Sequence, residues 1–134
     1  MSEDRPQVEF FETTKPFADV LQELEFAITE RNFRITGRNR IGEEIRKRGY
    51  PTFPNVEVIH FCNLEYAREF LTLAPRFVAQ IPYRITVHEE GDLVHIGLIW
   101  LSQDQDDPRI RQFATRMNGL LREIVQFALQ ENAR

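Results

Sequence analysis

The sequence predicts a two-layer α+β domain, with a mostly antiparallel sheet and helices packed on one face. Residues 83–101 alternate apolar and polar side chains around a glycine-containing turn, which is typical of a half-buried β-hairpin. Residues 17–31 and 108–131 repeat apolar side chains at spacings of three and four, as amphipathic helices do. Short connections between these elements favour antiparallel pairing. We therefore expect a single domain over residues 1–134.

The composition is that of a globular protein, with 42% hydrophobic and 28% charged residues. A net charge of -4 argues against a domain dedicated to nucleic acid, because such domains are usually basic over one face. The chain has no run of ~18 apolar residues that would span a membrane, and its polar start lacks the apolar core of a signal peptide. One cysteine cannot form an intrachain disulfide, which agrees with a reducing compartment. We expect a cytoplasmic protein with no nucleic-acid or membrane partner.

The first third of the chain predicts a strand and a helix, then a shorter pair. A strand at 8–13 precedes the helix at 17–31, for which Thr13 or Thr14 can be the N-terminal cap and Asn32 the C-terminal cap.

The shorter pair is a strand at 33–36 and one or two helical turns at 41–50. The charges of this second helix are interpreted as a solvated face, although an anion-binding arm is the functional alternative.

The stretch from Val56 to Pro82 is where we expect chemistry, if the protein has any. Both sides of the strand Val56–Cys62 are largely apolar, so we expect it to be buried on both sides or to lie near the sheet centre. His60 and Cys62 share one of these sides. Asn63 then begins a helix as its cap.

The hairpin at 83–101 predicts its own register. A two-residue turn at Gly91-Asp92 sets His88 opposite His95 on one face. A turn at Glu90-Gly91 would keep the faces but move the two histidines to a diagonal. The first register also pairs apolar residues on the other face: Tyr83 with Trp100, Ile85 with Leu98 and Val87 with Ile96.

The C-terminal helix begins with a clear signal, Asp107 followed by Pro108. Its apolar stripe is interpreted as packing on the sheet rather than as a cofactor site. The two ends of the chain, residues 1–7 and 130–134, are expected to be a loose tail and a frayed end.

A family resemblance emerges from the run VIHFCNLEYAREFL, followed by APRFVAQIPYRITVHEEGDLVHIGLIW. It resembles the core of the domain of unknown function 302 family, in which a strand ends in Cys-Asn or Gly-Asn before a helix. The matching residues are Cys62-Asn63 at that junction, Ile81-Pro82 before the hairpin and Glu89-Glu90-Gly91 at its turn. Leu64 departs from the proline that is common there.

The resemblance covers roughly Glu9 to Leu101, with a family-like core at 8–101 and a C-terminal helix at 108–131 that looks longer than in many relatives. It implies a TATA-binding-protein-like fold with a β-α-β-β-β-β-α core, and it implies no settled activity.

Cys62 is the sharpest candidate for chemistry. A thiol at a helix N-terminus meets the positive end of the helix dipole and free N–H groups, which lower its pKa and favour the reactive thiolate. The structural alternative is a small buried side chain that closes a strand.

Histidines supply the other candidates. His60 and Cys62 can face one metal ion or haem, and His88 and His95 add two ligands if the faces coincide. Solvated histidines are the ordinary alternative. Arg84 and Thr86, on the hairpin face of the histidines, can bind a small anion, and a solvated sheet face or a dimer surface is equally compatible with them.

The sequence contains no catalytic signature and specifies no cofactor. We expect a small non-enzymatic binding protein, self-associating as a homodimer, that takes a small-molecule or anionic ligand. The alternatives are a thiol-dependent sulfur-transfer or redox protein using Cys62, and a metal or haem protein using His60 and Cys62. The candidate ligand-binding residues are His60, Cys62, Asn63, Arg84, His88 and His95.

Overall fold

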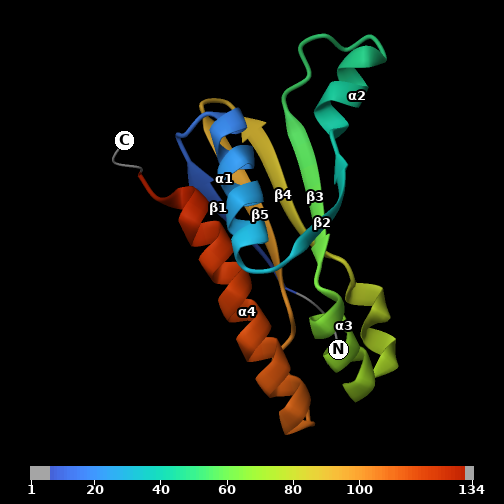
Figure 1. Ribbon diagram of the computed structural model, residues 1–134. Helices are drawn as coiled ribbons and strands as arrows, with labels where there is room; N and C mark the ends of the chain where they lie inside the picture. The colour runs from blue at the N-terminus through green and yellow to red at the C-terminus, as the bar shows by residue number, and fades with distance from the viewer. Residues whose placement is uncertain (1–6, 132–134) are drawn as a thin grey trace.

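The computed structural model describes residues 7–131, and it confirms the predicted α+β class (Figure 1). Five strands form one sheet in the order β1-β5-β4-β3-β2, and every neighbouring pair is antiparallel. The elements are β1 (Gln7–Thr13), α1 (Phe17–Glu30), β2 (Arg34–Asn39), α2 (Ile41–Lys47), β3 (Val56–Cys62), α3 (Leu64–Leu73), the 3₁₀ helix η1 (Pro75–Gln80), β4 (Tyr83–Glu90), β5 (Leu93–Trp100) and α4 (Pro108–Leu129).

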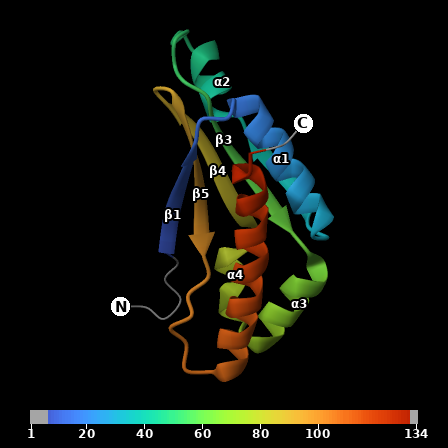
Figure 2. The same ribbon diagram turned by 90° about the vertical axis from the view of Figure 1, so that its left-hand side faces the viewer.

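The helices lie on one side of the sheet, and none of the described helices covers the other (Figure 2). We call these two sides the covered face and the open face. Helices α1 and α4 pack against each other across the covered face. Helix α3 lies at one end of the sheet, and α2 lies at the opposite end, the end that also holds the β4–β5 turn.

The core forms between the covered face and the apolar stripes of α1 and α4. Alternate residues of the central strands point to this side, as the period of two requires. Their side chains are fully buried, and each buried Leu, Ile or Phe stabilises the fold by roughly 1.5–3 kcal/mol. The largest fully buried side chains of the protein are Ile59, Phe61, Ile85, Ile96 and Leu98 of the sheet, Leu24 and Ile28 of α1, Phe70 of α3, Phe77 of η1, and Phe113, Met117 and Leu121 of α4.

The predicted hairpin register is confirmed for the pairs from Ile85–Leu98 to His88–His95. Glu90 pairs with Leu93, so the turn is Gly91-Asp92, and Gly91 adopts φ +62°. Glycine adopts this left-handed conformation without the steric cost that other residues meet. The described ladder starts at Ile85, and Tyr83 has no β5 partner in it.

Of the two alternatives expected for β3, a place inside the sheet is confirmed, because β3 lies between β4 and β2, and burial on both sides is wrong. Glu57, Ile59 and Phe61 are buried, whereas His60 and Cys62 on the other side are only half-buried. The reason is that helices cover one face, and periodicity within a single strand carries no information about how many layers cover the sheet.

Capping was predicted correctly for α3 and α4 and wrongly for α1. Asp107 caps α4, because its carboxylate accepts a hydrogen bond from the Arg109 backbone N–H. Helix α1 starts after Pro16, which has no capping side chain. Thr13 lies in β1 instead, where its hydroxyl accepts from the Lys15 backbone N–H.

The ends of several elements also differ. Strand β2 continues past a bulge to Asn39, and α4 ends at Leu129. Asn32 takes φ +65° directly after α1, in the role expected of it. Gln7, expected in the tail, belongs to β1, whereas the rest of that tail and residues 132–134 lie outside the described residues.

Candidate functional site on the open face

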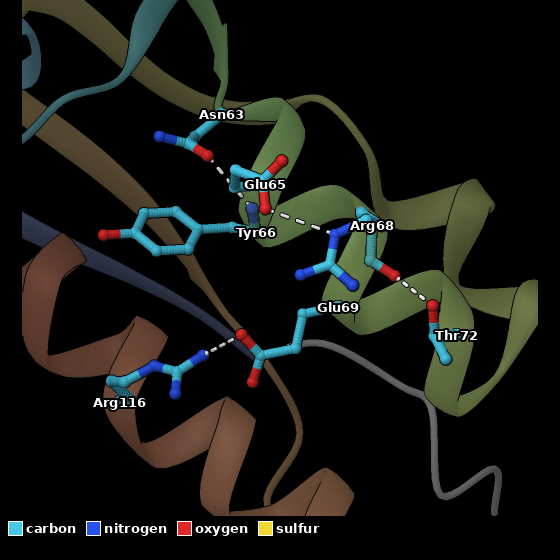
Figure 3. Close-up of polar contacts among 7 residues, drawn as sticks. All are labelled: Asn63, Glu65, Tyr66, Arg68, Glu69, Thr72 and Arg116. Carbon is cyan, nitrogen blue, oxygen red and sulfur yellow. Dashed lines mark hydrogen bonds and ion pairs between the residues drawn. The ribbon is translucent and has the colours of Figure 1, made fainter.

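The junction between β3 and α3 is held by Asn63. Its side-chain oxygen accepts a hydrogen bond from the Tyr66 backbone N–H at 3.0 Å (Figure 3). Its amide nitrogen donates to the backbone carbonyl of Asn32 at 2.8 Å, which ties the start of α3 to the turn between α1 and β2. At the far side of α3, Glu69 pairs with Arg116 of α4 at 2.7 Å (Figure 3). The cap predicted at Asn63 is confirmed, and the junction has a defined geometry.

Cys62 occupies the last position of β3 as a free, half-buried thiol. Burial raises the pKa of this thiol, and this effect outweighs the backbone N–H of Asn63, which lowers it. The expectation that the helix N-terminus lowers the pKa of this thiol is therefore wrong in sign. Desolvation of the thiolate raises the pKa more than one amide donor lowers it.

An open groove of about 490 Å³ lies beside Cys62. Arg34 lies directly opposite Cys62 in the β2–β3 ladder, and Arg84 lies directly opposite His60 in the β3–β4 ladder. Within residues 7–131, neither guanidinium takes part in a hydrogen bond or an ion pair. We call Arg34, His60, Cys62 and Arg84 the basic corner. The groove is lined by Asn32, Arg34, Thr36, Cys62, Asn63, Leu64 and Glu65.

His60 is already engaged within the protein, because its Nε2 atom lies 2.6 Å from the Asn39 side-chain oxygen. This contact fixes the imidazole against β2. It does not support His60 as a free partner for Cys62 in metal or haem ligation.

The other two histidines lie at the hairpin end of the open face. The His88 and His95 rings stack with centroids 4.8 Å apart and an interplanar angle of 11°. Phe10 of β1 packs edge-on against His88 at 5.9 Å. The Glu90 Oε1 atom lies 3.6 Å from His88 Nε2 and 3.7 Å from His95 Nε2.

The open face thus holds two separate groups. His88 lies four residues beyond Arg84 on β4, which is about 13 Å at ~3.3 Å per residue. Val56, not His60, is the β3 partner of His88. A single metal site from His60, Cys62, His88 and His95 is therefore excluded.

Two residues that complete these groups, Arg34 and Glu90, were not predicted as site residues from the sequence. Glu90 follows His88 by two positions in one strand, so the period of two places both on one face. This signal was present in the sequence. Arg34 had no equivalent signal, because its place beside Cys62 depends on the pairing of β2 with β3 across a bulge.

Comparison with known proteins identifies the family. The family model described as Domain of unknown function DUF302 matches residues 10–128. This chain belongs to that family. The match extends beyond Leu101 and includes most of α4.

A solved structure of the same DUF302 family supports the fold. It is an uncharacterized conserved protein from Bacillus stearothermophilus, with a TM-score of 0.76 and 14% sequence identity over 92% of this chain and 98% of that chain. At this identity the similarity concerns the fold alone. No curated protein matches this chain. Among the described residues, no helix has the length and apolar character needed to cross a membrane.

Proposed function

We propose that this DUF302 protein is a small non-enzymatic binding module that takes a small anion at the basic corner. The observation that carries the proposal is the pair of guanidiniums, Arg34 and Arg84, without a partner in residues 7–131 and flanking His60 and Cys62 on the open face. Arginine forms planar, charge-assisted hydrogen bonds with carboxylate and phosphate groups. A cationic site beside an open groove suits such ligands.

The neighbours of the two arginines support an anion. Helix α3 begins at Leu64, so the positive end of its dipole lies at the groove. The raised pKa of the Cys62 thiol favours the neutral form, which does not repel an anion. The same pKa shift disfavours thiolate chemistry, which makes a sulfur-transfer or redox role the weaker alternative. The single free cysteine supports a reducing compartment, so a cytoplasmic location belongs to this proposal.

The test is a titration with inorganic phosphate and, separately, a short dicarboxylate, followed by calorimetry and amide NMR shifts. Arg34→Gln and Arg84→Gln should each weaken binding about tenfold or more, the loss expected for a charge-assisted contact. Arg48→Gln is the matched control, because this exposed arginine follows α2 at the opposite end of the sheet. No binding by the wild type, or an equal loss in the control, would refute the proposal.

A second candidate role, self-association, rests on the edge strand β1. Val8 and Phe10 are each 58% exposed, and no described strand pairs with the outer edge of β1. An apolar edge strand is a template for pairing with another chain. The opposite edge, β2, carries a bulge and Arg34 and Arg38, features that oppose such pairing. We therefore propose a homodimer in which two β1 strands pair, which leaves the basic corner free.

Sedimentation analysis tests this dimer. Val8→Lys should convert the wild-type dimer to a monomer, because a charge on the edge opposes strand pairing. Val78→Lys, in η1, places the same charge on a 61% exposed valine away from β1 and should leave the dimer intact. A monomeric wild type, or a dimer that survives Val8→Lys, would rule out pairing through β1.

A further inference from the structure

We propose that His88, Glu90 and His95 form a binding site for a divalent transition-metal ion of the Zn²⁺ or Co²⁺ class. Within residues 7–131, these three side chains form a group whose potential metal-ligand atoms lie close together. Two imidazole nitrogens and one carboxylate oxygen make a donor set that zinc and its neighbours accept. The site is independent of the basic corner and lies at the other end of the open face.

The hairpin fixes the backbone positions of the three residues before any metal binds. His88 and His95 are direct cross-strand partners in the β4–β5 ladder, and Glu90 follows on the same face just before the turn. The turn is tight, with Gly91 at φ +62°. A site on paired strands loses little backbone freedom on binding, so more of the interaction free energy remains for affinity.

The separations between ligand atoms are close to those of a metal site. All three atoms lie within 4.8 Å of one another. Bonds of about 2.0–2.1 Å in a tetrahedral site place two ligand atoms ~3.4 Å apart. The two carboxylate–imidazole separations, 3.6 and 3.7 Å, are slightly longer than this. They are too long for direct hydrogen bonds.

The two imidazole rings must tilt from their parallel stack for both nitrogens to point at one ion. Both side chains are partly exposed, 31% for His88 and 17% for His95, so the rings can rotate. The edge contact with Phe10 supports His88 from one side. Three protein ligands on an exposed surface leave the fourth tetrahedral position to water.

The surrounding charge also suits a cation. Glu12 is the β1 partner of His95, which brings a second carboxylate to the same part of the sheet. The nearest cation of the basic corner along β4 is Arg84, four residues from His88 and therefore about 13 Å away. Most of the charge repulsion from that guanidinium is screened over this distance, which exceeds the ~8 Å Debye length at physiological salt.

The experiment is a titration of tag-free full chain with Zn²⁺ by calorimetry and with Co²⁺ by visible absorption. We expect one ion per chain and a Co²⁺ ligand-field spectrum. His88→Gln and His95→Gln should each weaken binding on the order of 100-fold, at least the loss seen when groups around metal ligands are altered. Glu90→Gln should also weaken binding, by about tenfold or more.

The third histidine supplies the matched control. His60→Gln and Cys62→Ala should leave metal affinity unchanged, since both residues lie at the basic corner. Circular dichroism confirms that each variant is folded. Unchanged affinity in His88→Gln and His95→Gln, absence of binding by the wild type, or loss of binding in His60→Gln or Cys62→Ala would overturn the assignment. Anion binding is also measured for His88→Gln. If this variant still binds the anion, a result at the metal site is independent of the proposed anion site.

Discussion

The two faces of the sheet are built from the same strands but carry different chemistry. In β4, Tyr83, Ile85 and Val87 are buried under helices, whereas Arg84 and His88 point to the open face. A period of two assigns alternate residues to packing and to binding. Stability and binding can therefore be separated residue by residue in this protein. Substitutions on the covered face should change the free energy of unfolding, and those on the open face should change ligand affinity.

The sharpest test of this difference uses two neighbouring residues of β5. Leu98 is fully buried on the covered face, and Ile99 is half-buried on the open face. Leu98→Ala should lower the free energy of unfolding by about 3 kcal/mol, within the ~2–5 kcal/mol of core truncations. Ile99→Ala should cost about 1 kcal/mol, because less apolar area leaves water. Urea unfolding measures both, and equal costs would contradict the distinction between the faces.

The next effect concerns the charged pair at the β2 side of the covered face. Glu57, with a side chain 5% exposed, accepts a hydrogen bond from Arg38 Nε at 2.6 Å and forms an ion pair with Arg38 Nη2 at 2.5 Å. Arg38→Met leaves this carboxylate without its cation. We expect a loss of about 2 kcal/mol, less than the ~3–5 kcal/mol of a fully buried pair, because Arg38 is 23% exposed.

The double variant Arg38→Met with Glu57→Met is the control for this pair. It removes both charges and should recover most of the stability, because apolar residues of similar size replace buried ion pairs well. A double variant less stable than Arg38→Met alone would show that Glu57 has another essential contact.

The features predicted correctly from sequence depend on local patterns. The hairpin turn at Gly91, the Asn63 cap and the long helix from Pro108 each follow from residues close in the chain. The burial of Glu57 has no such signal, because its partner Arg38 comes from another strand. Thr13 is of a residue type that commonly caps helices, but it lies in β1.

The candidate site was predictable as a set of residues but not as an arrangement. Alternation along β3, and pairing within the hairpin of β4 and β5, group His60 with Cys62 and His88 with His95, but they do not show that these two pairs share one face of the sheet. Their division into two groups follows from the β3–β4 register, which pairs His60 with Arg84. Register between strands joined by a helix depends on packing of the whole sheet rather than on a turn. The sign of the pKa shift of Cys62 likewise depends on burial by distant residues.

Gly97 provides a smaller effect on the open face. A Cβ atom here would lie 2.2 Å from the Thr86 hydroxyl oxygen and 2.8 Å from the Phe10 ring. Gly97→Ala should therefore displace the Phe10 ring and cost about 1 kcal/mol, at the low end for overpacking because both neighbours are side chains. Gly119→Ala in α4 meets no atom within 4 Å and should stabilise the protein by ~0.5–1 kcal/mol. Thermal unfolding distinguishes these signs, and a stabilising Gly97→Ala would contradict the close packing of Phe10.

The smallest effect on stability, and the one that separates binding from thiol chemistry, is expected at Cys62. Because burial raises the pKa of this thiol, its thiolate fraction at pH 8 should be lower than that of an unfolded chain. Alkylation by iodoacetamide should be correspondingly slow, and its pH midpoint should fall to the ordinary thiol value in urea. The folded state holds this proton more tightly, so the contribution of Cys62 to stability is present below the ordinary pKa and is lost as pH rises through the raised one. Cys62→Ala removes that dependence. A midpoint in the folded protein below that in urea would instead favour a reactive thiolate, and with it the sulfur-transfer or redox alternative over the anion-binding role of the basic corner.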